Sequence, residues 1–378
     1  MSAIVNISSL FGRSNGRKKI IVTGGGTGGH IFPAIAIAKA LQVSHPEMDI
    51  LFVGAKGKME MEKVPQAGFD IVGITVAGLN RSSILKNWKL PFQLLAGFNE
   101  VRQIFKHFRP MAVVGVGGYA SFPVMRYAQF IGIDTYIHES NSFAGKSNIL
   151  LGKKAKAIFV ATPGMEKFFP AEQIMITGNP VRNEIENNTL QKPEAIRSFG
   201  LTTDKPIVLV MGGSLGARSI NDAIAQHLSH LNDKVQVIWQ TGKNNADHYA
   251  AMAKLYPSVY ISQFIYQMDA AYAAADIIVS RSGAMTVAEV CLAAKAAILV
   301  PFPQAAEDHQ TANARYLTDR KAALLIPDAQ VAQELVPLIL QLAANVSLRE
   351  ELGKTAGTLA VHSAAQKIAQ FILTHSYA

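Results

Sequence analysis

The sequence predicts an α/β protein built from two Rossmann-like domains with parallel sheets, facing each other across an interdomain cleft. The prediction rests on a pattern that occurs twice: an apolar strand runs into a glycine-rich turn and then a helix, at residues 18–41 and again at residues 206–228. The length of 378 residues is sufficient for two domains of ordinary size. Hydrophobic residues make up 49% of the chain and charged residues 17%, which indicates a globular protein and excludes a disordered one.

Glycine and proline mark where the first domain ends. The motif GNPVR, at residues 178–182, follows a strand-like run and is typical of a domain junction. We therefore expect an N-terminal extension at residues 1–17, a first domain at 18–180, a second domain at 181–355, and a C-terminal helix at 356–378 that can return to the first domain.

The charge of the chain indicates an anionic partner. Lys and Arg number 36 against 27 Asp and Glu, giving a net charge of +9. Such an excess suits nucleic acid, an anionic membrane or a phosphorylated substrate, and no nucleic-acid-binding motif accompanies it. The single cysteine, Cys291, excludes a disulfide framework and a cysteine-built metal site, and it favours a reducing cytosol.

Two absences bear on targeting. The first sixteen residues lack the basic start and long apolar core of a signal peptide. No run approaches the roughly 18 apolar residues of a spanning helix, so we expect any contact with a membrane to be peripheral.

The first glycine-rich turn is GGGTGGH, residues 24–30, which follows the strand at residues 18–22. Its glycines match the dinucleotide pattern G-x-G-x-x-G, but the next strand ends in Gly54, Ala55 and Lys56, without the acidic residue that holds a ribose. The nicotinamide interpretation is therefore incomplete. His30 follows the glycines at the mouth of the sheet, ahead of a helix expected from Pro33, and an imidazole with an ordinary pKa near 6.5 can take a proton from a hydroxyl.

Further polar groups follow later strands of the first domain. GGYASFP, residues 117–123, is a second small-residue turn, and HESN, residues 138–141, ends the strand at 135–137. Asn141 has an amide that can both donate to and accept from a sugar hydroxyl. Arg182 is either a surface cation or a junction arginine that reaches a pyrophosphate.

The second domain repeats the pattern with GGSLGAR, residues 212–218, where Ser214 and the surrounding N–H groups form a second anion cradle. Strands are expected at 235–239 and 259–261. The turn FIYQM, residues 264–268, offers apolar atoms and free backbone groups that can hold a flat base at Ile265.

Residues 277–310 bring two turns together. They predict a strand at 277–279, a small-residue turn, a helix from about Met285, a second strand at 297–300 and a polar turn that ends at Gln310. Because parallel strands end at one edge of the sheet, both turns are expected at the edge where open α/β sheets bind ligands.

The first of these turns suits a nucleotide sugar. Gly283 lets the backbone approach a ligand, and Thr286 with the N–H groups of the helix start favours phosphate. Glu289 lies one helical turn further on, where its carboxylate can accept two adjacent ribose hydroxyls. A solvated helix residue is the alternative for Glu289, and the presence of Gln310 favours the sugar site.

Residues 78–105 combine apolar anchors with cations, which is the pattern of a segment that enters an anionic lipid surface. An amphipathic helix packed on its own sheet is the alternative. The residues predicted for the membrane patch are Leu85, Lys86, Trp88, Lys89, Leu90 and Phe92.

Seven motifs in this order resemble the MurG family of UDP-N-acetylglucosamine transferases: GGTGGH, GGYASFP, HESN, GNPVR, GGSLGAR, SRSGAMTVAE and PFPQAAEDHQTANA. The resemblance runs from about Lys18 to the C-terminus. It implies a GT-B fold and an enzyme peripheral to the cytoplasmic face of the bacterial inner membrane. The implied reaction transfers N-acetylglucosamine, with inversion, to the 4-hydroxyl of the muramyl sugar of lipid I, giving lipid II. Partners among cell-wall synthesis and division proteins are implied as well.

From its place at the strand-to-helix turn, we expect His30 to be the general base, and Tyr119 and His30 are candidates for the acceptor side. The resemblance assigns roles to further residues. The implied donor-binding residues are Thr27, Gly28, Gly29 and Asn141 at the sugar, Arg182 and Ser214 at the phosphates, Ile265 at uracil, Ala284, Met285, Thr286, Val287, Ala288 and Glu289 at the sugar, phosphate and ribose, and Gln310 at the N-acetylglucosamine hydroxyls. Two positions depart from the family: Ser140 replaces the glutamine of HEQN, and His309 stands where relatives carry glutamine.

No D-x-D motif occurs in the chain, so we expect catalysis without a metal or another cofactor. Three alternatives stay open. A lipid glycosyltransferase acting on diacylglycerol shares the donor motifs, a UDP-N-acetylglucosamine 2-epimerase shares the two facing domains and needs no lipid, and a nucleotide-sugar sensor binds the donor without consuming it.

Overall fold

The computed structural model describes residues 17–76, 90–213 and 215–376, with side chains from residue 96 onward in the middle range. The chain forms two compact units. The first comprises Met1–Val181 and Ser363–Ala378, and the second comprises Arg182–His362.

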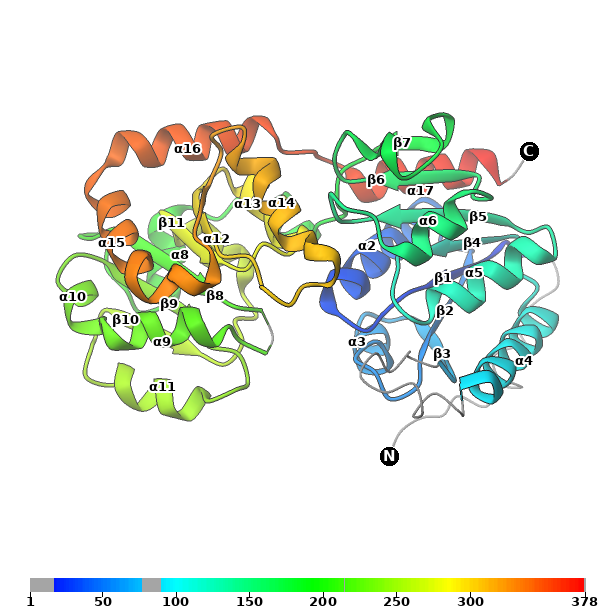
Figure 1. Ribbon diagram of the computed structural model, residues 1–378, viewed down its shortest axis with the longest axis horizontal. Coiled ribbons are helices and arrows are strands. Elements are labelled where there is room, and N and C mark those ends of the chain that lie inside the picture. Colours follow the sequence, from blue (N-terminus) through cyan, green and yellow to red (C-terminus); the bar gives the residue numbers. More distant parts are fainter. Residues whose placement is uncertain (1–16, 77–89, 214, 377–378) are drawn as a thin grey trace. The chain divides into compact units, whose positions relative to one another are not determined.

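The first unit contains a seven-stranded parallel sheet in the order β3-β2-β1-β4-β5-β6-β7 (Figure 1). Its inner strands are apolar and buried on both faces, as expected when helices cover both sides of a parallel sheet. The strands are β1 Lys19–Thr23, β2 Asp49–Ala55, β3 Asp70–Ile74, β4 Ala112–Gly115, β5 Asp134–Glu139, β6 Ala157–Val160 and β7 Ile174–Ile176.

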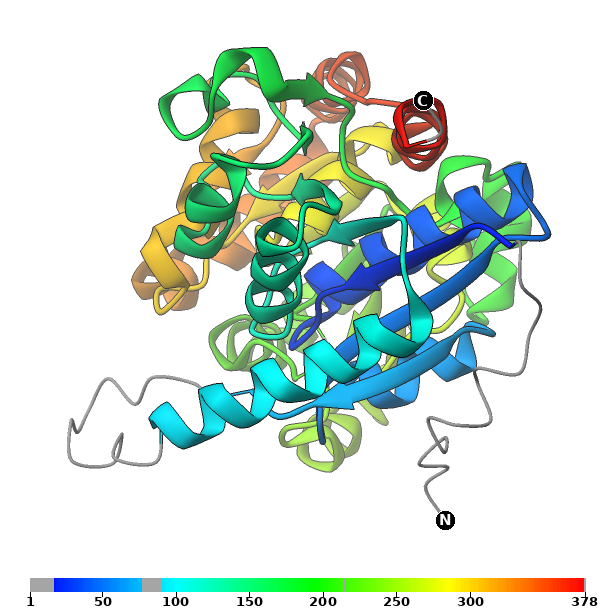
Figure 2. The ribbon, with the colours of Figure 1, turned by 90° about the vertical axis from the view of Figure 1, so that its right-hand side faces the viewer.

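Helices cover both faces of this sheet (Figure 2). One core cluster joins strand residues to α2 Gly28–Ser44, α3 Glu60–Gln66 and α17 Ala364–His375. The other joins them to α4 Leu90–Phe108, α5 Ser121–Phe130 and α6 Lys146–Gly152. The short turns η2 Met165–Lys167 and η3 Ala171–Gln173 lie between β6 and β7.

The end of the chain packs on the first unit. Ile368 and Ile372 of α17 lie fully buried in the core cluster that includes α2. The Tyr136 hydroxyl is 2.9 Å from Ser376 Oγ, and Lys156 Nζ donates to the carbonyl of His375 over 2.6 Å. We expected one helix from residue 356, whereas the structure has two, because α16 Val346–Thr358 ends in the second unit and α17 begins after a break.

The second unit contains a six-stranded parallel sheet in the order β10-β9-β8-β11-β12-β13. The strands are β8 Ile207–Met211, β9 Gln236–Gln240, β10 Val259–Ser262, β11 Ile277–Ser280, β12 Ala296–Leu299 and β13 Leu324–Leu325. The helices are α7 Asn183–Glu186, α8 Lys192–Ser198, α9 Arg218–Gln226, α10 Leu228–Asn232, α11 Ala246–Ala253, α12 Met268–Ala274, α13 Ala284–Ala293, α14 His309–Thr318, α15 Val331–Ala344 and α16, with the short turns η4 Ala306–Asp308 and η5 Asp328–Gln330.

Both sheets reverse their strand order at one point, between β1 and β4 in the first unit and between β8 and β11 in the second. Open α/β sheets bind ligands outside the carboxyl ends of the strands at such a switch point. All four strands end in the glycine- and serine-rich turns singled out in the sequence. The topology therefore places one candidate site at the strand ends of each unit.

The structure corrects the start of one helix and adds three strands. We expected a helix from Pro33, but α2 begins at Gly28, so that His30 lies in its first turn and Pro33 lies inside it. The strands β3, β7 and β13 were not anticipated; all three are edge strands, and β7 and β13 have only three and two residues.

No single helix in the described ranges is long and apolar enough to cross a membrane. One pair, residues 328–344 and 346–358, passes the test of length and composition together, with a bend of 99° between the helices. Leu335, Ile339 and Leu342 of this pair are fully buried in the core of the second unit.

Candidate active site

The turn between β11 and α13 has the backbone of an anion site. Gly283 has an extended backbone as the N-cap of α13, and the first N–H to bond back into the helix is that of Val287, which donates to the Gly283 carbonyl over 3.0 Å. The N–H groups of Met285 and Thr286 therefore precede the helical hydrogen-bond ladder. Both residues are partly exposed, as is Ala288, whereas the side chains of Ala284 and Val287 are buried.

Val287 accordingly lies differently from the expectation. Its side chain is only 7% exposed and its N–H is already bonded. Neither the side chain nor the N–H of Val287 is therefore available to a ligand. Val287 can affect a nucleotide sugar only through the shape of the helix.

Glu289 is buried, not solvated. Only 8% of the residue is exposed, and its two carboxylate oxygens accept from different donors. The Tyr272 hydroxyl donates to Oε2 over 2.8 Å, and Arg182 Nη2 donates to Oε1 over 3.3 Å. The alternative of a solvated helix residue is therefore wrong. A buried carboxylate with two donors is held in one orientation.

The second polar turn is tied to the first. Ser282 Oγ donates to the backbone carbonyl of Gln310 over 2.8 Å, and Asn313 Nδ2 donates to the carbonyl of Ser282 over 3.2 Å. The Gln310 side chain accepts the Phe302 N–H at Oε1 over 2.9 Å. Since that bond fixes the orientation of the amide, its Nε2 group is the one turned to donate.

Arg281 joins three segments at this edge. Its Nη1 lies 2.6 Å from Asp328 Oδ1 and also donates to the carbonyls of Val300 and Pro301, while Nη2 donates to Ser219 Oγ over 3.2 Å. Ser219 is the second residue of α9, which follows the glycine-rich turn after β8. The Arg281 guanidinium therefore connects the turns that follow β11 and β12 to the start of α9 and to Asp328, which lies after β13.

The FIYQM turn differs from the expectation at Ile265. The side chain is only 2% exposed, and the N–H that we expected to be free donates to Gln240 Oε1 over 2.9 Å. Gln240 also donates from Nε2 to the carbonyl of Gly213 over 3.3 Å, which ties this turn to the glycine-rich turn after β8. Apolar surface for a base comes instead from the next residue, Tyr266, which is 84% exposed.

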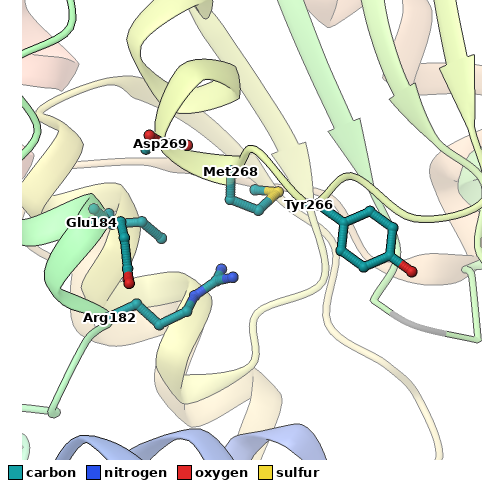
Figure 3. Close-up of a pocket in the computed structure, with 6 residues that line it drawn as sticks. Arg182, Glu184, Tyr266, Met268 and Asp269 are labelled. Atoms are coloured by element: carbon teal, nitrogen blue, oxygen red, sulfur yellow. The ribbon is translucent and has the colours of Figure 1, made fainter. Parts of the chain in front are cut away.

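A pocket of about 270 Å³ opens beside these residues (Figure 3). The Arg182 guanidinium extends toward Met268, and Tyr266 stands at the other end with its ring turned outward. The complete lining is Arg182, Glu184, Ile185, Tyr266, Met268 and Asp269. The pocket thus combines a cation and an aromatic ring with the apolar chain of a methionine.

The first glycine-rich turn encloses a carboxylate. Glu60, 1% exposed at the start of α3, accepts the Gly26 N–H at Oε2 over 2.9 Å and the Ala55 N–H at Oε1 over 3.0 Å. A diphosphate in this turn would compete for the Gly26 N–H and would be repelled by the carboxylate. The geometry therefore opposes a dinucleotide at this turn, as the missing acidic residue after β2 already indicated.

His30 lies between this turn and the next. Its Nδ1 is 3.3 Å from Thr27 Oγ1, and a Cβ atom added at Gly117 would lie 3.0 Å from His30 Nε2. Thr27 and Gly29 are exposed, and Gly28 and His30 are half-buried. Gly117 has a φ of +93°, so a glycine both adopts the turn and leaves room for the imidazole.

The HESN segment is organised by Glu139, which is 3% exposed. Its Oε1 accepts the N–H and the side-chain amide of Asn141, and its Oε2 accepts from the Gly145 N–H and from Asn148 Nδ2. The amide of Asn141 is thus oriented by its neighbour. Ser140 is buried, with Oγ 3.3 Å from His138 Nδ1, so its side chain faces the interior of this unit.

The remaining residues predicted for the site lie at partly or fully exposed positions, or outside the described residues. Tyr119 is 67% exposed on the turn after β4, and the His309 ring is 2.7 Å from the carbonyl of Ala306. Burial raises the pKa of the Cys291 thiol to about 12. Ser214, Leu85, Lys86, Trp88 and Lys89 lie outside the described residues, as do the side chains of Leu90 and Phe92.

Comparison with known proteins decides the family. Residues 20–160 match the glycosyltransferase family 28 N-terminal domain, and residues 207–368 match the family 28 C-terminal domain. A Porphyromonas gingivalis protein is 47% identical over 94% of this chain and 95% of its own length. Its name is UDP-N-acetylglucosamine–N-acetylmuramyl-(pentapeptide) pyrophosphoryl-undecaprenol N-acetylglucosamine transferase. A Bacteroides thetaiotaomicron protein of the same name is 45% identical, over 94% of this chain and 97% of its own length.

The chain belongs to the MurG family of glycosyltransferases. The crystal structure of Acinetobacter baumannii MurG superposes with a TM-score of 0.75 at 30% identity, covering 94% of this chain and 99% of that one. The two parallel Rossmann-like sheets are therefore those of the GT-B fold. A UDP-N-acetylglucosamine 2-epimerase of known structure also resembles the chain, with a TM-score of 0.61 over 96% of this chain and 98% of its own. At 13% identity that likeness shows the fold alone.

Sequence reasoning missed several residues that the MurG fold brings into these sites. Tyr272, Arg281, Gln240 and Glu60 lie in otherwise ordinary helix, strand or turn sequences, and no spacing marks them. Arg281 stands inside the SRSGA motif, but its partners Asp328 and Ser219 are 47 and 62 residues away in the chain.

Proposed function

We infer that this MurG-family chain transfers N-acetylglucosamine from UDP-N-acetylglucosamine to lipid I, the undecaprenyl-pyrophosphoryl muramyl pentapeptide, and so forms lipid II. Relatives of 45–47% identity that carry the name of this activity support the inference over almost the whole chain. The structural observation that favours it is the β11–α13 turn, where a helix N-terminus and the oriented carboxylate of Glu289 lie on one helix. Phosphate and ribose of a nucleotide sugar match these two groups in charge and in hydrogen bonding.

We propose that the second unit holds the donor. Met285 and Thr286 would donate to the diphosphate, and Arg182, which already lines the pocket, would add positive charge. Glu289 would accept the ribose hydroxyls, and Tyr266 would contact the uracil in place of the buried Ile265 side chain. Gln310 would donate from Nε2 to the sugar. We propose that Ser214 serves the phosphates as well.

We propose that the first unit presents the acceptor, with His30 as general base. The muramyl 4-hydroxyl oxygen would attack the anomeric carbon of N-acetylglucosamine while the bond from that carbon to the diphosphate oxygen breaks. The hydroxyl proton would pass to an imidazole nitrogen of His30, and UDP would leave with the electron pair of the broken bond. A single displacement inverts the anomeric centre. Tyr119, exposed on the neighbouring turn, is proposed to contact the acceptor, and Thr27, Gly28, Gly29 and Asn141 the donor sugar.

The size of each energetic contribution indicates which effects lower the activation barrier most. A helix N-terminus contributes at most about 2 kcal/mol to an anion. Enzymes lower barriers by roughly 8–23 kcal/mol, so positioning of donor and acceptor must supply much of the difference. This is consistent with the number of buried contacts, such as those of Arg281 and Gln240, that connect ligand-facing turns to one another.

The direct test incubates the purified protein with UDP-N-acetylglucosamine and lipid I, in parallel reactions with and without a chelator. We expect lipid II and UDP in equal amounts, at the same rate in both reactions. Transfer to diacylglycerol and not to lipid I would identify the lipid glycosyltransferase, and conversion of the donor sugar without any acceptor would identify the epimerase. A rate that falls with chelator would overturn the metal-independent mechanism.

We further propose that the protein binds the anionic cytoplasmic leaflet through its first unit. The net charge of +9, the cations among residues 78–105 and the exposed apolar end of α5, where Phe130 is 79% exposed, support this proposal. Vesicles with anionic lipid should co-sediment with the protein, and neutral vesicles should bind less. A Trp88→Ala variant that binds both as the native chain does would argue against residues 78–105 as the anchor.

A further inference from the structure

Tyr272 is a fully buried tyrosine whose hydroxyl points at the carboxylate proposed to read the ribose. It lies on α12, is 2% exposed, and donates to Glu289 Oε2 over 2.8 Å. The hydroxyl also lies 4.0 Å from the sulfur of Met211 at the end of β8. Burial raises the pKa of Tyr272 well above its ordinary value, with the Glu289 carboxylate adding to the effect. The hydroxyl therefore stays protonated and remains a donor.

The other oxygen of the carboxylate has a different donor. Arg182 Nη2 donates to Glu289 Oε1 over 3.3 Å from the segment that opens the second unit. One donor on each oxygen fixes the plane of the carboxylate. An ionised carboxylate offers about four lone-pair sites, so acceptor capacity remains on both oxygens for two adjacent hydroxyls.

We propose that Tyr272 is a positioning residue that orients Glu289 for recognition of the ribose and thereby sets the selectivity for a ribonucleotide donor. The inference rests on the proposed function, in which Glu289 accepts the ribose hydroxyls. Tyr272 itself touches no substrate, and its effect passes through the Oε2 bond. Without the hydroxyl, one oxygen of a buried carboxylate loses its protein donor, and the carboxylate can rotate about the Arg182 contact.

The contrasting explanation is that Tyr272 fills space in the core. The two explanations differ in what the hydroxyl does, because a phenylalanine fills the same space. They also differ in which substrate responds. A packing defect raises the KM of every donor alike, whereas loss of carboxylate orientation acts only where ribose hydroxyls are read.

The chain supplies a matched control. Tyr249 is another buried tyrosine of the second unit, 1% exposed, and its hydroxyl donates to a carboxylate, Asp222 Oδ1, over 2.7 Å. It lies on α11 and packs on α9, and the partner of its hydroxyl is Asp222 of α9. A Tyr249→Phe variant therefore removes the same kind of bond in the same unit without touching the proposed ribose reader.

The experiment measures transfer to lipid I by the native chain, Tyr272→Phe and Tyr249→Phe, with UDP-N-acetylglucosamine and with its 2′-deoxyribose analogue. For Tyr272→Phe we expect a donor KM roughly tenfold higher with the ribose donor, from loss of one hydrogen bond to a charged group. Turnover should change little, and the variant should discriminate less between the two donors. Tyr249→Phe should keep the native discrimination.

A cycle with Glu289→Gln completes the test. If Tyr272 acts through Glu289, adding Tyr272→Phe to Glu289→Gln should raise the donor KM by much less than it does in the native chain. An equal KM increase for both donors, or additive effects in the cycle, overturns the positioning role. If the native chain transfers the sugar equally well from both donors, Glu289 does not recognise the ribose hydroxyls, and the role proposed for Tyr272 is overturned. If the native chain transfers no sugar to lipid I, the proposed function itself fails.

Discussion

The chemistry proposed for the first unit depends on how His30 is held. Thr27 Oγ1 lies 3.3 Å from Nδ1, and Gly117 leaves room beside Nε2. The ring is thereby constrained from two sides by the first turn of α2 and by the turn after β4. When Nδ1–H donates to Thr27 Oγ1, Nε2 is the unprotonated nitrogen that takes the proton, because a hydrogen bond at one nitrogen sets the tautomer at the other.

Replacing His30 with alanine should lower turnover by about 100- to 10,000-fold, the usual contribution of a general base. The donor KM should change little, because donor contacts are assigned mainly to the second unit. Steady-state kinetics with lipid I separates the two parameters. His45→Ala is a suitable control, since His45 caps the other end of the same helix and bonds to Glu47 at the surface. Near-native turnover in His30→Ala would remove His30 from the chemistry.

Burial differs between two adjacent residues of the HESN motif. Ser140 and Asn141 are adjacent, yet Ser140 faces the interior beside His138 and Asn141 is oriented by Glu139. The replacement of the family's glutamine by Ser140 therefore sits on the buried side of the turn. We expect it to matter for packing around His138 more than for contact with the substrate.

At the scale of elements, the turn after β8 and the turn after β9 are in direct backbone contact. Gly216 has a φ of +85°, and a Cβ atom there would lie 2.1 Å from the carbonyl oxygen of Thr241. The turn after β8 therefore packs directly on the turn after β9. The next residue on the facing turn is also a glycine, and a Cβ atom at Gly242 would lie 2.0 Å from the Gly216 nitrogen, so this approach of two backbones requires glycine on both sides.

A Gly216→Ala variant should be destabilised more than a Gly200→Ala variant. Gly200 also has a positive φ, +69°, but a Cβ atom there meets nothing within 4 Å. The Gly200 variant should lose about 1–2 kcal/mol from backbone strain alone. The Gly216 variant adds the clash and should exceed about 3 kcal/mol. Urea unfolding midpoints measure both, and equal losses would show that the Thr241 contact relaxes without cost.

The two units share one plan, which explains why both sites lie at strand ends. Each sheet is parallel, each reverses its order after the first strand, and each places its glycine-rich turns on either side of that reversal. The groups that we propose for the donor lie in the second unit, with Glu289, Gln310 and the pocket beside Arg182. The first unit has a buried carboxylate, Glu60, where a nucleotide-binding turn would receive a phosphate. We therefore propose that the same architecture binds different ligands in the two units.

Stability of the fold should fall in mild acid because of His138. Burial, with a smaller contribution from the nearby His30, lowers the pKa of His138 from 6.5 to about 4, and a hydrogen bond with the Gly178 backbone opposes part of this shift. The folded state binds the proton less well than the unfolded chain, so stability is full above about pH 6.5 and declines as the pH falls toward about 4. The loss attributable to His138 is about 3 kcal/mol across that window.

Urea unfolding at several pH values, with a His138→Gln variant for comparison, measures this contribution. The native chain should lose more stability than the variant between pH 6.5 and 4. Parallel losses in the two proteins would show that carboxylates, and not His138, dominate the acid response.

The order of strands, turns and helices was largely predictable, because a buried parallel strand is an apolar run and glycine marks the turn that follows it. The predicted strand at residues 277–279 and the helix from Met285 are confirmed by β11 and α13, with boundaries shifted by one residue. Local patterns failed where a long-range contact decides the outcome. The early start of α2 at Gly28 is one example, and the short edge strands β3, β7 and β13 are others.

The amino-acid sequence alone determined the repeated Rossmann-like plan, the family and the glycine-rich turns at the strand ends, because all three depend on residues close together in the chain. Folding decided which polar groups are free to act. Glu289 is a buried carboxylate that accepts hydrogen bonds from Tyr272 and Arg182. The N–H of Ile265 donates to the side chain of Gln240. These pairs are separated by 17, 107 and 25 residues. No periodicity or motif extends over such distances, and only packing brings the partners within a hydrogen bond.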